Sequence, residues 1–139
     1  MIEAIRRRQV ATDAIARFRG VPLAFGTADC ARLGTFVLYG MGHRSPLAQA
    51  MRYRTAGGAG RALRKRGFDT LLAAIDSIGL GRIPPAAALP ADLIMLPGED
   101  VFGGSLTMAV GNGRVLGYHE DMPGAEILQP AEYLAAWRL

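Results

Sequence analysis

The residue with the clearest capacity for chemistry is Cys30, the only cysteine of the chain. It follows a Gly-Thr-Ala-Asp turn at residues 26–29 and opens an apolar run that reaches Tyr39 with the pattern of a helix. Thr27 or Asp29 can cap this helix, because short side-chain oxygens accept hydrogen bonds from the free N–H groups of a first turn. Cys30 is therefore predicted in a first turn, where the helix dipole favours a thiolate over a thiol.

Two interpretations of Cys30 follow from this placement. At a helix start with a cation nearby, a thiol pKa of about 8.5 can fall to roughly 3.5–7.5, which produces a nucleophile. Alternatively, the thiol is buried and packs as a small hydrophobic group, as free cysteines commonly do. The sequence leaves both interpretations open.

Composition bounds the remaining chemistry. With 139 residues, of which 50% are hydrophobic, the chain is expected to form a single domain over residues 1–139. One cysteine and two histidines provide neither an internal disulfide nor a zinc-type ligand set, so no metal or cofactor is predicted. No run reaches the roughly 18–20 apolar residues of a membrane span, and the N-terminus lacks the apolar stretch of a signal peptide. A soluble domain without an export signal is expected.

The net charge of +4 is carried almost entirely by arginine, with clusters at residues 6–8 and 61–66. Such clusters could contact nucleic acid or an anionic wall polymer. The alternative, a solvated helix face or a subunit contact, is preferred because no aromatic residues or nucleic-acid motif accompany the charge. The sequence therefore predicts no nucleic-acid partner.

The first part of the chain has helical periodicity. Apolar residues recur at helical spacing over residues 2–18, with the arginines on the other face, and Gly20 ends this helix. A second helix is predicted from Cys30 to about Tyr39. Further on, the sequence predicts a short helix capped by Ser45 through Met51, a loop over residues 53–60, and short helices over residues 61–66 and 70–78.

After Pro90 the apolar period changes to that of strands. Strands are predicted over residues 92–96, 105–110, 114–119 and 126–128, with Gly111-Asn112-Gly113 as a hairpin turn. Residues 131–138 are predicted to form a terminal helix that carries Tyr133 and Trp137 as core or interface anchors. Helices followed by an antiparallel sheet predict an α+β fold, with N-terminal helices packed on a small sheet.

Three segments carry a family resemblance. Residues 25–30 are Phe-Gly-Thr-Ala-Asp-Cys, residues 90–95 are Pro-Ala-Asp-Leu-Ile-Met, and residues 108–116 are Met-Ala-Val-Gly-Asn-Gly-Arg-Val-Leu. In order and spacing they resemble a Gly-x-x-Asp-Cys turn, a Pro-Gly-Asp-Leu-Val-Phe strand and an Ile-Tyr-Leu-Gly-Asn-Gly-Arg-Val-Ile hairpin. These are motifs of the NlpC/P60 group of papain-like cysteine peptidases, particularly its small phage-tail-associated members. The resemblance covers most of residues 18–120.

The resemblance implies a papain-like, NlpC/P60-type fold and a hydrolase of cell-wall peptides, with Cys30 as nucleophile. It also implies a place in the virion tail, with tail hub or tip subunits and peptidoglycan peptides as partners. One position departs from the family pattern. The catalytic histidine of that family opens the strand before the Gly-Asn-Gly turn, and this chain has Ser105 there. A serine cannot act as the base for a thiol near neutral pH.

His119 is the candidate replacement for the missing base. It lies two residues after Gly117, which stands where the family has its third, orienting polar residue, and residues two apart on a strand share a face. An imidazole with a pKa near 6.5 suits a general base. The alternative is a solvated histidine at a strand end, beside Glu120 and Asp121. His43 is a poor candidate because it follows the far end of the Cys30 helix.

The two acidic residues of these motifs each have a structural interpretation. Asp29 either caps the helix or orients a catalytic partner, and capping is the preferred interpretation. Asp92 is predicted to be a turn or hydrogen-bonding residue. Two functions follow for the chain: a cysteine hydrolase that uses Cys30, His119 and Asp29, or a catalytically inactive structural or adaptor component of a tail tip with the same fold. They differ in whether an imidazole can reach the sulfur of Cys30.

Overall fold

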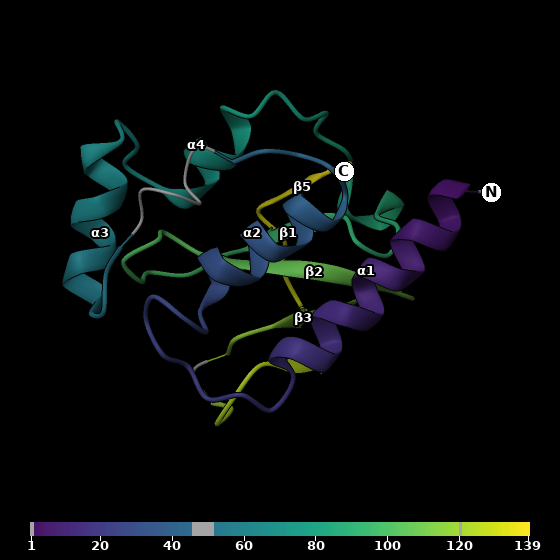
Figure 1. The fold of residues 1–139 in the computed structure, drawn as a ribbon, viewed down its shortest axis with the longest axis horizontal. Coiled ribbons are helices and arrows are strands. Elements are labelled where there is room, and N and C mark those ends of the chain that lie inside the picture. The colour runs from purple at the N-terminus through teal and green to yellow at the C-terminus, as the bar shows by residue number, and fades with distance from the viewer. Residues whose placement is uncertain (1, 46–51, 120) are drawn as a thin grey trace.

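A computed structural model describes residues 2–45, 52–119 and 121–139 (Figure 1). Helices occupy the first part of the described chain and strands the second. The elements are α1 (Ile2–Phe18), α2 (Cys30–Gly40), α3 (Ala56–Lys65), α4 (Leu71–Asp76), the 3₁₀ turn η1 (Pro85–Ala87), β1 (Leu93–Leu96), β2 (Ser105–Gly111), β3 (Arg114–Gly117), β4 (Glu126–Leu128) and β5 (Ala135–Trp137). The predicted α+β layout is confirmed. The helix predicted through residues 46–51 lies outside the described residues.

The five strands form one antiparallel sheet in the order β4-β3-β2-β1-β5. The Gly111–Gly113 turn joins β2 to β3, and Asn112 has a φ of 56° in it. This backbone conformation is one that asparagine and glycine adopt readily in tight hairpins. The Asn-Gly hairpin signal in the sequence is therefore confirmed.

Helices α1 and α2 lie across one face of the sheet (Figure 1). Helix α2 packs directly on β2, where a Cβ atom placed on Gly34 would overlap the side chain of Leu106. The two helices also approach closely, since a Cβ on Gly40 would lie 2.9 Å from a methyl carbon of Val10. The main core fills this layer and contains the strand residues Leu93, Met95, Leu106 and Met108.

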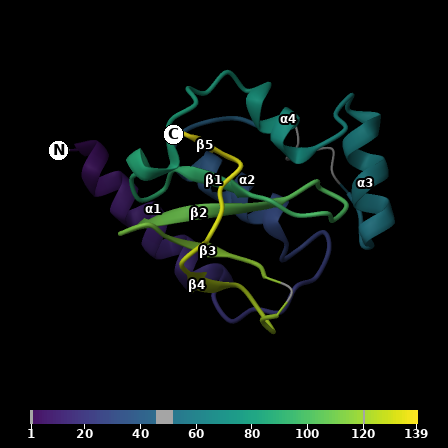
Figure 2. The same cartoon turned by 180° about the vertical axis from the view of Figure 1, so that it is seen from behind.

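The opposite face of the sheet is covered by the segment around the 3₁₀ turn η1 and by connecting chain. Figure 2 shows the connection from β4 to β5 running across this face. A smaller apolar cluster lies here, which includes Ile94 and Ala109 and is partly covered by Ala88. Successive residues of β1 thus contribute to different cores, as the alternation of a strand requires.

The predicted C-terminal helix is wrong, because residues 135–137 form strand β5. This strand pairs antiparallel with β1, in the register Leu93 to Trp137. Trp137 is fully buried and its indole N–H donates to Asp76 Oδ1 at 2.8 Å, so its predicted anchoring role in the core is confirmed. Tyr133 lies in the connection before β5 and is 38% exposed. Pairing with the free edge of β1 outweighs the helical propensity of this alanine-rich segment.

Helix α3 begins within residues 53–60, where a loop was predicted. Its N-cap is Thr55, whose Oγ1 accepts a hydrogen bond of 3.0 Å from the Gly58 N–H. The three glycines at positions 57, 58 and 60 lower the helical propensity of this segment. Burial of Ala59 and Leu63 against the rest of the fold compensates for that weakness.

Replacing Thr55 by alanine is expected to lower the free energy of unfolding by about 1 kcal/mol, because the capping oxygen is lost from a glycine-rich first turn. Urea denaturation followed by the fluorescence of Trp137 measures the change. A Thr55→Ser variant keeps the oxygen and serves as the control, with an expected change within about 0.5 kcal/mol. Equal losses in the two variants would assign the effect to the methyl group instead.

Arg7 is an exception to the expected exposure of the α1 arginines, because it is 4% exposed. Its Nη1 donates to Asp92 Oδ1 at 2.7 Å and to the Pro90 carbonyl oxygen at 3.1 Å. Asp92, fully buried, also accepts hydrogen bonds from the backbone N–H groups of Leu89 and Leu139, both at 2.9 Å. The prediction of Asp92 as a hydrogen-bonding residue is confirmed, and its charge explains why Arg7 is buried.

Candidate functional site

The turn before α2 is held by Asp29, which is fully buried. Its Oδ1 accepts a hydrogen bond of 2.8 Å from the Arg32 N–H, which confirms it as the N-cap. Its Oδ2 accepts from the Gly26 N–H at 2.9 Å and from the Tyr53 hydroxyl at 2.7 Å. Both carboxylate oxygens of Asp29 thus serve the turn that positions Cys30.

Cys30 is the first residue of α2, as predicted, and its side chain is buried, with 5% of the residue exposed. Burial raises the pKa of the Cys30 thiol far above the ordinary range, although a hydrogen bond from the Leu106 backbone N–H acts in the opposite direction. The negative charges of Asp29 and Asp100 raise the pKa further. The helix dipole favours the thiolate, but desolvation opposes it more strongly. Of the two interpretations that the sequence left open, this environment therefore favours the buried, neutral thiol over the reactive thiolate.

Ser105 begins β2 and lines the same cleft as Cys30, and the backbone N–H of the next residue, Leu106, bonds to the thiol. In the resembled family the position of Ser105 is that of the catalytic histidine. The Ser105 hydroxyl donates a hydrogen bond of 3.1 Å to the carbonyl oxygen of Tyr118. It therefore joins β2 to the chain that follows β3, and it supplies no base to Cys30.

His119 lies two residues beyond the end of β3, which stops at Gly117 rather than at residue 119 as predicted. Its side chain is 48% exposed, and its Nδ1 accepts a hydrogen bond of 3.3 Å from the Asp121 N–H. A neutral imidazole that accepts at Nδ1 carries its proton on Nε2. The basic nitrogen of His119 is thus engaged by Asp121, and within the described residues no hydrogen bond or ion pair joins His119 to Cys30.

A cleft of about 600 Å³ brings the predicted site residues together. Asp29, Cys30, Ser105 and His119 all line it. Leu23 and Met122 add exposed apolar side chains to its wall. The loop after β1 contributes Glu99 and Asp100, and Asp100 Oδ1 accepts hydrogen bonds of 3.1 Å from the N–H groups of Phe102 and Gly104.

Two tyrosines complete the site and were not predicted as site residues. Tyr53 donates to Asp29, and burial is the main cause that raises its pKa. Tyr118 lines the cleft beside Ser105, and within the described residues its buried hydroxyl has no hydrogen-bond partner. Burial raises the Tyr118 pKa, and the negative charge of Asp29 adds to the effect. The Tyr118-His119 pair at the predicted end of a strand was the signal that could have identified Tyr118.

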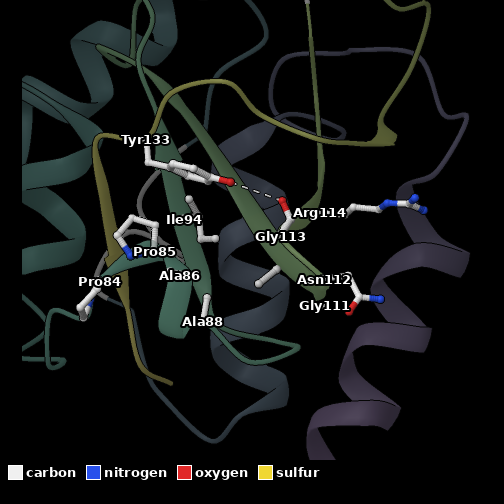
Figure 3. A pocket seen from close by; sticks show the side chains of 11 residues that line it. Pro84, Pro85, Ala86, Ala88, Ile94, Gly111, Asn112, Gly113, Arg114 and Tyr133 are labelled. Atoms are coloured by element: carbon white, nitrogen blue, oxygen red, sulfur yellow. Dashed lines mark hydrogen bonds between the residues drawn. The ribbon is translucent and has the colours of Figure 1, made fainter.

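A second cavity, of about 580 Å³, lies on the opposite face of the sheet (Figure 3). Ile94 and Ala109 of the sheet line it, together with the segment around η1 and Tyr133. The Tyr133 hydroxyl donates to the Gly113 carbonyl oxygen at 3.4 Å, while the Arg114 side chain points away from the cavity. Among the described residues, this cavity is lined mainly by small and apolar side chains, whereas the Cys30 cleft carries a thiol, an imidazole and three carboxyl groups.

Two further properties of the described residues bear on the site. Over residues 2–45, 52–119 and 121–139, no three or more histidine, cysteine, aspartate or glutamate side chains are grouped so that they could hold a metal ion. No helix in the same part of the chain is long and apolar enough to cross a membrane.

The fold and the site together define an α+β domain in which a buried cysteine begins a helix packed against an antiparallel sheet. The chain belongs to the DUF6950 family, described as a domain of unknown function, whose family model matches residues 4–139. No matching sequence was found among curated proteins.

Proposed function

We propose that this chain is a papain-like domain of the NlpC/P60 type that acts as a structural or adaptor component of a phage tail tip and does not hydrolyse peptides. The observation that carries the proposal is the buried Cys30 thiol, whose pKa is raised by burial and which has Ser105 at the place of the family's catalytic histidine. A neutral thiol without a base is a poor nucleophile.

The hydrogen bonds around the cleft support a non-catalytic role. Asp29 uses both oxygens to hold its own turn, and Ser105 binds the carbonyl oxygen of Tyr118. His119 directs its acceptor nitrogen toward Asp121. The polar groups that could perform acyl transfer are thus used to stabilise the fold around Cys30.

The proposed partners and location come from the motif resemblance. Tail hub or tip subunits are the proposed partners, the virion tail is the proposed location, and a peptidoglycan peptide is the proposed occupant of the cleft. The exposed side chains of Leu23 and Met122 support the cleft as a contact site, because apolar groups at the wall of a groove favour binding of a partner chain.

A cysteine hydrolase of cell-wall peptides is the second candidate, and a specific observation favours it: Cys30 and His119 line the same cleft. In this mechanism the His119 ring releases Asp121, turns, and takes the proton of the thiol. The thiolate attacks the peptide carbonyl, and N–H groups at the start of α2 hold the oxyanion. The imidazolium then protonates the leaving amine, and water hydrolyses the thioester that remains on Cys30.

The reactivity of Cys30 separates the two candidates. For the non-catalytic domain, we expect alkylation by iodoacetamide near neutral pH to be slow, and to be unchanged in His119→Ala, because the thiol must first be exposed by local opening.

The raised pKa of Cys30 also determines how the stability of the fold depends on pH. Above about pH 8.5 the unfolded chain loses the thiol proton while the folded chain keeps it, so stability decreases as the pH rises.

The measurements are the alkylation rate as a function of pH and the release of amines from peptidoglycan-derived peptides. Unfolded protein in urea provides the reference rate for an exposed thiol. A Cys30→Ala variant is the control for peptide cleavage, and the proposal expects no difference from the wild type. A thiolate that titrates below its free value and depends on His119, together with cleavage that requires Cys30, would establish the hydrolase instead.

A further inference from the structure

A long segment of the chain carries positive charge without any negative charge. Between Asp29 and Asp69 the sequence contains no aspartate or glutamate. The same segment holds half of the 16 arginines and lysines of the chain, namely Arg32, Arg44, Arg52, Arg54, Arg61, Arg64, Lys65 and Arg66. The net charge of the whole chain is only +4, but basic residues are concentrated in this segment and acidic residues are absent from it. The segment is therefore a local source of positive potential.

Six of these residues lie in α3 and the residues beside it, and all six are exposed. We call them the α3 basic segment: Arg52, Arg54, Arg61, Arg64, Lys65 and Arg66. Helix α3 stands at one side of the molecule, away from α1 (Figure 1). Within the described residues, no member of the α3 basic segment forms an ion pair, since the acidic side chains that do so pair with basic residues elsewhere.

The glycines of α3 let two guanidinium groups lie close to the helix backbone. A Cβ atom on Gly57 would lie 3.3 Å from Arg61 Nη1, and one on Gly60 would lie 3.2 Å from Arg64 Nη1. Both arginines therefore fold back toward the N-terminal end of α3, in the direction that helical side chains favour. Arg61 Nη1 thereby lies beside the first turn of α3, where the helix dipole adds partial positive charge to its own.

The side chains of the α3 basic segment determine which kind of partner it suits. Tyr53 and Leu63 are buried, and no large apolar side chain of residues 52–66 is exposed. A protein interface has an apolar or aromatic centre, and binding of single-stranded bases requires exposed aromatic rings for stacking. Residues 52–66 also contain no asparagine or glutamine for reading base edges. What remains is a set of guanidinium and ammonium groups suited to repeated phosphates.

We propose that the α3 basic segment binds a linear phosphodiester polymer through its phosphate groups, without regard to what the phosphates connect. An anionic wall polymer and the backbone of duplex DNA both have this chemistry. The sequence predicted no nucleic-acid partner because no nucleic-acid motif or aromatic residues accompany the charge. The present proposal differs because binding to phosphate groups alone requires neither. It does not depend on whether Cys30 reacts.

Fluorescence anisotropy with labelled poly(glycerol phosphate) and with a labelled duplex DNA of mixed sequence tests the proposal on the full chain. Each polymer is titrated at several salt concentrations, because phosphate contacts release counterions and log K falls linearly with log salt. In an Arg61→Ala/Arg64→Ala double variant we expect affinity to fall on the order of tenfold per arginine near 0.1 M salt. We also expect the salt slope to decrease by about two.

An Arg8→Ala/Arg114→Ala double variant is the matched control, because it removes the same charge from exposed positions outside the α3 basic segment. It should retain the affinity and the salt slope. Binding of either polymer that is lost only in the α3 variant supports the proposal. Whichever polymer binds identifies the source of the phosphates, a wall polymer or duplex DNA. Equal losses in both variants, no binding of either polymer, or equally tight binding of poly-glutamate would overturn it, the last in favour of an acidic protein.

Discussion

Replacing Asp92 by alanine is expected to lower the free energy of unfolding by about 3–5 kcal/mol, because it leaves a buried charge without its partner. Asp92 is fully buried and its Oδ1 lies 2.7 Å from Arg7 Nη1. The Arg7 guanidinium would keep only carbonyl oxygens and the exposed Glu3 as acceptors. The backbone N–H groups of Leu89 and Leu139 would lose their acceptor as well. Urea denaturation followed by Trp137 fluorescence measures the loss.

Two further variants show whether the loss comes from the buried pair. Arg138→Ala removes a cation that lies 3.2 Å from Asp92 Oδ2 but is 37% exposed, so a loss within about 1 kcal/mol is expected. Arg7→Met/Asp92→Ala removes both buried charges, and its loss should be smaller than the loss in Asp92→Ala added to the loss in the single variant Arg7→Met. A loss in Arg138→Ala as large as that in Asp92→Ala would show that burial of Arg7 is not the cause.

Replacing Gly26 by alanine is expected to lower the free energy of unfolding by about 2–5 kcal/mol and to expose Cys30. Gly26 has a φ of +92°, which L-residues with a Cβ atom rarely adopt, and its added Cβ would overlap the carbonyl oxygen of Tyr53. Relief of that overlap must move the turn that bonds to Asp29 through the Gly26 N–H. The alkylation rate of Cys30 should therefore rise together with the loss of stability.

Gly20→Ala provides a control with the same kind of backbone strain. Gly20 has a φ of +77°, but a Cβ atom on it would meet no described atom within 4 Å. We expect a loss of about 1–2 kcal/mol from the left-handed conformation alone, with little change in the alkylation rate of Cys30. Equal losses of unfolding free energy in the Gly20 and Gly26 variants would show that the contact with Tyr53 is not the cause of the loss at Gly26.

Where local signals and packing agree, the fold could be predicted from the sequence. Helix α1 has its predicted bounds, and strand β4 also lies where it was expected. The Asn-Gly turn joins β2 to β3 as predicted, because a positive φ is required there and asparagine and glycine supply it. Asp29 was preferred as a helix cap for a similarly local reason, and it is one.

The errors arose where a distant segment decided the structure. Residues 135–137 form a strand because the edge of β1 was available to them, which no local pattern reports. Arg7 is buried because Asp92 lies opposite it, although the two are far apart in the sequence. Helix α3 begins earlier than predicted because burial of Ala59 and Leu63 against the rest of the fold compensates for its glycines.

The candidate site was predicted in its composition but not in its chemistry. The cleft contains the cysteine, serine and histidine that the motifs identified. The direction of the Cys30 pKa shift depends on burial under the rest of the fold, which spacing along the chain does not reveal. The hydrogen bond that His119 Nδ1 accepts from the Asp121 N–H, two residues further on, depends on the geometry of a turn. Local motifs therefore identified residues that line one cleft, whereas the surroundings of Cys30 determine the direction of its pKa shift.

The position of β5 has a consequence for folding during synthesis. The strand that completes one edge of the sheet is the last element of the described chain, and it pairs with β1, the first strand to be made. The Leu139 N–H also completes the set of donors around Asp92, which holds α1 through Arg7. A nascent chain that ends before residue 135 presents β1 as an open edge, the kind of surface that recruits other strands. Pairing at this edge of β1 and the last donor to Asp92 are therefore available only once residues 135–139 have left the ribosome.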